Sequence, residues 1–137
     1  MIGVLEQVHY FSNVALFGLI WTIQLVHYPG FKYVDRQEFT AFTRMHTYKV
    51  TFFVAPLMLL EFSAALTLMV MGWFSVLPVL FFIIILMVWA STFLMSVPYH
   101  QRLARGKDEA VIDKLIQTNW IRTILWTVKL VLLIIVY

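Results

Sequence analysis

The stretch VLPVLFFIIILMVWASTFLMSV, residues 76–97, contains no charged side chain. A helix needs roughly 20 apolar residues to cross the hydrocarbon core of a bilayer, so this stretch predicts a membrane-spanning helix. Three other stretches are similarly apolar, residues 8–28, 50–71 and 119–137. The sequence therefore predicts an all-α polytopic membrane protein, a bundle of four transmembrane helices in which residues 1–137 form a single domain.

The overall composition agrees with a protein that lives in a lipid bilayer. Charged residues make up 12% of the chain, against about one quarter in soluble domains. The chain has no cysteine, which excludes disulfide bonds and thiolate metal sites. The net charge of +3 comes from basic residues beside the apolar stretches, so it does not indicate nucleic-acid binding. The first apolar stretch lacks a basic start, and we interpret it as a retained helix rather than a signal peptide.

Prolines, glycines and capping residues predict where the helices begin and end. The first span is expected to stop at Pro29 and Gly30, the second at Gly72 and the third at Pro98. The helix of the fourth span is expected to begin near Asp108, whose side chain can cap it.

The connection after the first span predicts an amphipathic cytoplasmic helix that leads into the second span. Asp35 is a possible N-cap for this helix. Phe39, Phe42 and either Met45 or His46 recur at helical spacing, as expected for a helix with one apolar face.

The basic residues predict the orientation in the membrane. Lys32, Arg36, Arg44 and Lys49 flank the first long connection, and Arg102, Arg105, Lys107, Lys114 and Arg122 flank the second. The N-terminus and the turn after Gly72 carry no Lys or Arg. By the positive-inside rule, both long connections are expected in the cytoplasm and both termini outside. The expected location is the bacterial inner (plasma) membrane.

Three histidines fall at the predicted cytoplasmic end of the bundle. His27 ends the first span, His46 opens the second and His100 follows the third. Imidazoles from facing helices can form a metal site inside a bundle, and three of them suit Zn, Cu or Fe. The alternative is that they are ordinary interfacial residues without a ligand.

Polar residues also form stripes on two of the spans. The first span carries His9, Asn13, Phe17, Ile20, Gln24 and His27 at helical spacing, and the fourth carries Asn119, Arg122, Trp126 and Lys129. Because polar groups facing lipid are costly, we expect the two stripes to face each other or a wet cavity. Three tryptophans inside spans, Trp21, Trp89 and Trp126, are placed to wall a flat apolar ligand or to fill the core.

The depth of the charged residues predicts a buried ion pair. Counting about 1.5 Å of rise per residue brings Glu61 of the second span level with Asn13 and within reach of Lys129. We therefore expect a Glu61–Lys129 pair with Asn13 or His9 as further partners. The pair either serves function or fixes helix register.

The chain resembles the small four-span membrane proteins of the anthrone-oxygenase-like family. The resemblance rests on HYP (residues 27–29), VPYHQRLARGKD (97–108) and NWIRTILWTVKLVLL (119–133). Members often carry Asn at the position of His100 and Arg at that of Lys129. The resemblance implies a shared site that contains His27, Pro29, Pro98, Asn119, Arg122 and Trp126. It also implies oxygenation of a flat polycyclic phenol, the best-known activity of the family.

The leading hypothesis is a membrane-embedded, metal-dependent oxidoreductase or oxygenase for a lipid-soluble aromatic or quinone-like molecule. The three histidines would hold the metal, or two of them would bind a haem. Arg122 would act in the reaction together with Glu61 and Lys129. The remaining candidates, Asn119, Trp126, Gln24 and Asn13, would line the cofactor or substrate.

Two other classes of function stay open. The intramembrane Glu61 and Lys129 could belong to a proton- or ion-coupled carrier or channel, which would need a homo-oligomer because four spans make a thin pore wall. A non-catalytic membrane scaffold is the third class, in which the polar stripes serve stability alone.

Overall fold

The computed structural model describes residues 2–72 and 75–136, and all of its regular elements are helical. The chain forms four rods, each long and apolar enough to cross a membrane. The first rod comprises α1 (Ile2–Thr22), η1 (Ile23–His27), α2 (Tyr28–Gly30) and η2 (Phe31–Tyr33), and the second is α3 (Arg36–Met71). The third comprises α4 (Val76–Ser91), η3 (Thr92–Ser96) and α5 (Val97–Leu103), and the fourth is α6 (Glu109–Val136). The predicted four-helix membrane bundle is confirmed.

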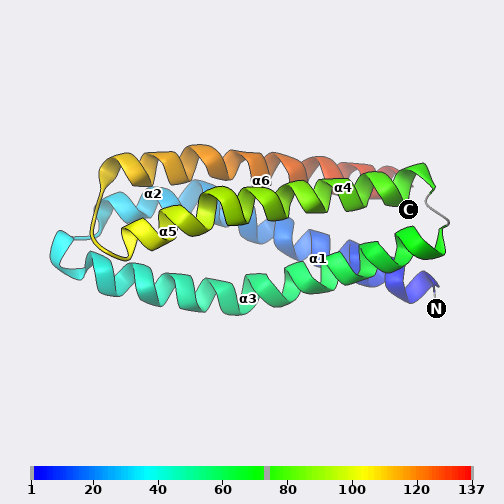
Figure 1. Ribbon diagram of the computed structural model, residues 1–137, viewed down its shortest axis with the longest axis horizontal. Helices are drawn as coiled ribbons and strands as arrows, with labels where there is room; N and C mark the ends of the chain where they lie inside the picture. The colour runs from blue at the N-terminus through cyan, green and yellow to red at the C-terminus, as the bar shows by residue number, and fades with distance from the viewer. Residues whose placement is uncertain (1, 73–74, 137) are drawn as a thin grey trace.

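The rods lie side by side along the long axis of the molecule (Figure 1). α1 packs against α3 and α6, and α4 packs against the same two helices, so the four rods form a ring. The two long connections lie at one end of the bundle, and the beginning of α1 and the end of α6 lie at the other (Figure 1). This arrangement brings the three predicted histidines to the end that carries the long connections.

The predicted stop at Pro98 is wrong, because α5 continues to Leu103. The stop predicted at Pro29 and Gly30 agrees with the end of α2 at Gly30, which the short 3-10 turn η2 follows. Each proline follows a five-residue π-helical segment, η1 or η3, after one intervening residue. The N–H of Tyr28 bonds the carbonyl of Ile23, and that of Val97 bonds the carbonyl of Thr92, five residues back in each case. The wider π turn accommodates a proline, which has no N–H to donate and needs space beside the preceding turn.

The predicted amphipathic helix and the second span are one continuous helix, α3, of 36 residues. Asp35 occupies the N-cap position with extended backbone, although its side chain makes no capping hydrogen bond. The cap predicted for the fourth helix is confirmed, since Asp108 Oδ1 accepts hydrogen bonds from the backbone N–H groups of Ala110 at 3.0 Å and Val111 at 3.2 Å.

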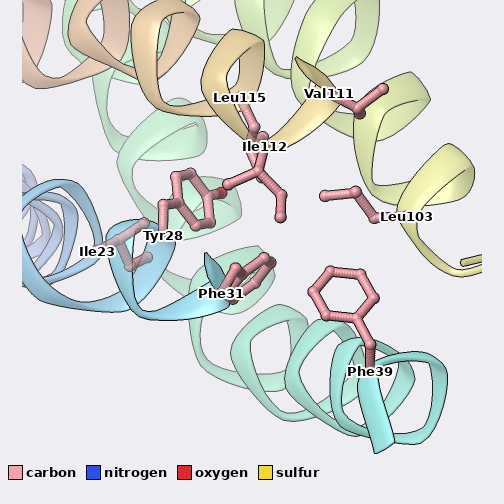
Figure 2. Packing of buried hydrophobic residues seen from close by; sticks show 8 residues of the cluster. All are labelled: Ile23, Tyr28, Phe31, Phe39, Leu103, Val111, Ile112 and Leu115. Atoms are coloured by element: carbon pink, nitrogen blue, oxygen red, sulfur yellow. The ribbon is translucent and has the colours of Figure 1, made fainter. Parts of the chain in front are cut away.

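A hydrophobic cluster and one lysine hold the connection end together. Figure 2 shows the cluster, in which Phe31 lies between Tyr28 and Phe39. Its buried members are Ile23, Tyr28, Phe31, Phe39, Leu103, Val111, Ile112 and Leu115. Lys107 Nζ donates to the carbonyls of Lys32 at 2.6 Å and Val34 at 2.8 Å, so it satisfies acceptors that the end of the first rod leaves open. The backbone that carries the side chains beside this cluster is therefore held in place by close packing.

Candidate functional site

A hydrogen-bonded network joins the polar stripes of the first and last rods. Asn119 Nδ2 donates to Gln24 Oε1 at 2.7 Å, and Arg122 Nη2 donates to Asn119 Oδ1 and, at 3.3 Å, to the Tyr28 hydroxyl. The Tyr28 hydroxyl also lies 3.0 Å from Nε2 of His100 on α5. The expectation that the two stripes face each other is confirmed at this level of the bundle.

The three histidines lie close together, but they differ in burial. The ring centroids of His27 and His46 are 4.5 Å apart, and those of His46 and His100 are 5.8 Å apart. His46 is buried, whereas the side chain of His27 is exposed. In the part of the chain that the structure describes, no group of three or more His, Asp or Glu side chains has the arrangement of a metal site.

The imidazoles as they are placed therefore do not form a three-ligand set. Nε2 of His100 is already in contact with the Tyr28 hydroxyl, which leaves Nδ1 of His46 and Nδ1 of His100 as buried nitrogens without a hydrogen-bond partner. The metal and haem hypotheses stay predictions.

The π turn of η1 explains why Tyr28 and not His27 joins the polar network. The sequence pattern placed His27 three residues after Gln24 on the inward face. A π turn takes more residues than an α turn, so the inward position falls one residue later, at Tyr28. Tyr28 is 3% exposed, in agreement with this shift. The sequence signal that would have found it is its spacing of four from Gln24.

The predicted Glu61–Lys129 ion pair is confirmed and is sealed inside the bundle. Lys129 Nζ lies 2.7 Å from Glu61 Oε1, and the two side chains are 0% and 1% exposed. Asn13 Nδ2 donates to the same oxygen at 3.0 Å, as expected, and Trp126 Nε1 donates to Glu61 Oε2 at 3.2 Å. The Trp126 contact was not predicted, although a buried indole N–H usually finds an acceptor.

His9 lies in the same region but makes no hydrogen bond to the pair. Both of its ring nitrogens are buried without a partner, and its ring packs edge-on against Phe81 with centroids 5.6 Å apart. The alternative of His9 as a direct partner of Glu61 is therefore wrong, and Asn13 takes that place.

A cavity of about 700 Å³ is lined by residues of all four rods. This volume is within the range of small-molecule sites. Apolar side chains form most of its wall toward the middle of the bundle, among them Leu16, Ile20, Met58, Trp89 and Trp126. Tyr28, His46, Ser96, His100 and Arg122 form a polar part, with Arg44, Tyr48 and Gln101 nearby.

The cavity opens through the side of the bundle. Tyr48 and Leu59 of α3 and Phe93 of η3 belong to its wall and are themselves 75%, 54% and 58% exposed. These side chains lie on the flank of rods that are long and apolar enough to cross a membrane, so the opening is on the side of the bundle that a bilayer would surround. The wall and the opening together form a lateral cavity that is accessible from the side of the bundle.

The cavity contains some of the predicted site residues and not others. His46, His100, Arg122 and Trp126 line it. His27, Gln24, Asn119, Asn13, Glu61 and Lys129 are not part of its wall. Of the three tryptophans predicted to wall a ligand, Trp21 instead donates to Thr127 Oγ1 at 3.0 Å, a contact between α1 and α6.

Comparison with protein-family models, with curated proteins and with solved structures found no match for this chain. The resemblance to the anthrone-oxygenase-like family therefore stays a prediction. The fold and the cavity define an integral membrane protein with a lateral pocket that carries polar groups on one side.

Proposed function

We propose that this protein binds a flat, lipid-soluble aromatic or quinone-like molecule in the lateral cavity and acts on it as a membrane oxidoreductase or oxygenase. The supporting observation is the position of the Tyr28–His100–Arg122 cluster in the wall of an otherwise largely apolar cavity that opens toward lipid. A ring system would lie against Met58, Trp89 and Trp126. An oxygen on it would face the cluster, which presents hydrogen-bond donors.

The contact between Tyr28 and His100 supports the reaction class. Oxidising a phenol or reducing a quinone moves protons together with electrons, so such a site needs a group that gives or takes a proton. The Tyr28 hydroxyl and the His100 imidazole lie within hydrogen-bond distance of each other and both line the cavity. They are our candidates for that role, with Arg122 polarising the ligand oxygen.

The carrier hypothesis is less well supported than the binding site. Its candidate groups, Glu61 and Lys129, are fully buried and hydrogen-bonded to each other and to neighbours. Neither residue lines the lateral cavity or the shallower cavity between α1 and α3. We therefore assign the pair a structural role and leave it out of the reaction.

Titration with anthraquinone, a neutral flat probe, tests the binding proposal. The protein would be placed in nanodiscs of phosphatidylcholine, and tryptophan emission followed as the probe is added. Because Trp89 and Trp126 line the cavity, we expect saturable quenching. Quenching that rises linearly with probe concentration, as for partition into lipid alone, would contradict the proposal.

Metal analysis tests the metal and haem hypotheses separately. Wild-type protein would be compared with a variant in which His27, His46 and His100 are all replaced by alanine. The metal hypothesis expects stoichiometric metal, or a Soret band for haem, in the wild type and neither in the variant. Equal and negligible metal in both after loading with Zn, Cu or Fe would reject it and leave the binding proposal in place.

We further propose that the long connections lie in the cytoplasm of a bacterial inner membrane, on the basis of their Lys and Arg residues. Because the chain has no cysteine, a single introduced cysteine is the only thiol that a maleimide can label. Ser75→Cys, at the end opposite the long connections, should react with a membrane-impermeant maleimide in intact spheroplasts. Gln37→Cys, at the start of α3, should react only after lysis. Both positions are exposed, so the reverse pattern would invert the proposed orientation.

A further inference from the structure

Arg122 is a buried cation that lacks a carboxylate partner. Arg122 is 6% exposed. Its guanidinium donates hydrogen bonds to the neutral oxygens of Asn119 and Tyr28. Its Nε is buried without an acceptor. No Asp or Glu among the residues that the structure describes lies within ion-pair distance of it.

Lys129, to which we assign a structural role, differs from Arg122 because its buried charge is paired with a carboxylate. Lys129, on the same helix, lies 2.7 Å from Glu61. A buried charge without a partner is costly in a protein interior and more so within a membrane. A guanidinium kept in this state is therefore expected to meet its counter-ion from outside the chain.

The position of Arg122 identifies where that counter-ion comes from. Arg122 lines the lateral cavity, next to the Tyr28 hydroxyl and on the same wall as His100. The planar guanidinium offers N–H donors in a fork that matches a carboxylate or another anionic oxygen. The buried Nε–H is one donor that the protein leaves free.

We propose that the molecule bound in the lateral cavity is an acid, and that Arg122 is the counter-ion of its carboxylate or phenolate oxygen. This inference rests on the proposed function, because it names the chemical class of that ligand. The apolar wall holds the body of the molecule, and the anionic oxygen lies against Arg122 and the Tyr28 hydroxyl. A neutral analogue of the same shape leaves the guanidinium uncompensated and binds more weakly.

Two probes of nearly equal shape test the charge preference. Anthraquinone-2-carboxylate and anthraquinone-2-carboxamide would be titrated against wild-type protein in phosphatidylcholine nanodiscs. We expect the carboxylate to bind about tenfold more tightly than the amide, the preference typical of a hydrogen bond to a charged group. Arg122→Gln should abolish that preference. Lys114→Gln removes an exposed cation from the same helix, outside the cavity wall, and should retain it.

The outcomes separate this inference from the proposal on which it rests. If neither probe shows saturable binding, the binding proposal fails and the inference fails with it. If both bind with equal affinity, the binding proposal stands and the inference is wrong. This comparison needs only the wild-type protein, so it decides even where Arg122→Gln does not fold.

A stability measurement distinguishes a ligand-binding arginine from a structural one. Without ligand, Arg122→Gln should have a Tm equal to or higher than that of the wild type, because it removes an uncompensated buried charge. The carboxylate probe should raise the Tm of the wild type more than that of the variant. A clear fall in Tm for ligand-free Arg122→Gln would assign Arg122 to the structural network with Asn119 and contradict the inference.

An anionic lipid head group is the other source of such an oxygen. Replacing part of the phosphatidylcholine with phosphatidylglycerol separates the two sources. After correction for the repulsion of the anionic probe by the anionic lipid surface, an aromatic acid should bind equally well in both nanodiscs. A loss of carboxylate binding in phosphatidylglycerol, together with a higher Tm that depends on Arg122, would assign the anionic oxygen to lipid.

Discussion

Replacing Lys129 with methionine should lower the free energy of unfolding by about 3–5 kcal/mol, the usual cost of breaking a buried ion pair on one side. Methionine has nearly the length of lysine, so packing changes little, but Glu61 loses its counter-ion. Glu61 then keeps only the donors of Asn13 and Trp126 in a site that excludes water. Unfolding of the purified protein in mixed micelles, with SDS as the denaturant, measures the change.

The double variant Glu61→Gln/Lys129→Met is the control for this prediction. Glutamine retains a carbonyl oxygen for Asn13 and Trp126 but carries no charge. It should therefore recover most of the stability that Lys129→Met loses, as seen when both partners of a buried pair are removed. A Lys129→Met protein as stable as the wild type, or a double variant no better than the single one, would contradict a structural role for the pair.

Replacing Ala55 with phenylalanine should weaken anthraquinone binding by about 100-fold, the effect of a severe clash between a ligand and a filled pocket. Ala55 lies on α3 in the wall of the lateral cavity, so a ring at this position takes the space that the proposal gives to the ligand. The same space allows the new side chain to fit, and we expect Tm to stay the same or to rise. Quenching of tryptophan emission in nanodiscs measures the affinity.

Leu66→Phe is the matched control for Ala55→Phe. Leu66 also lies on α3, but it is 37% exposed and lines neither cavity. It should leave the affinity for anthraquinone unchanged. If both variants lose affinity equally, or if neither loses affinity, anthraquinone does not bind in the lateral cavity.

Hydrophobicity and helical spacing were sufficient to predict the bundle and its buried ion pair. The four spans follow from the length of the apolar stretches, because a bilayer fixes the minimum length of a helix that crosses it. Glu61 and Lys129 could be paired because polar groups in lipid must meet and the rise per residue gives their depth. Both inferences use regular helix geometry, which α3 and α6 retain.

The details that required the structure are those in which the helix departs from that geometry. Neither the spacing of residues nor the prolines revealed that η1 and η3 are π-helical, and Pro98 is not the helix end that the sequence predicts. The extra residue in η1 moved the inward position from His27 to Tyr28. The cavity depends on how far the rods stand apart, a property of packing between distant residues that no single stretch encodes.

Photo-crosslinking with benzophenone tests the central claim that the lateral cavity is a ligand site. The label would be activated with the protein in phosphatidylcholine nanodiscs, and the modified residues identified by mass spectrometry with and without excess anthraquinone. We predict modification of cavity residues such as Met58 and Val54, suppressed by anthraquinone. Modification confined to outward residues such as Phe52 and Leu66, and insensitive to anthraquinone, would contradict the claim.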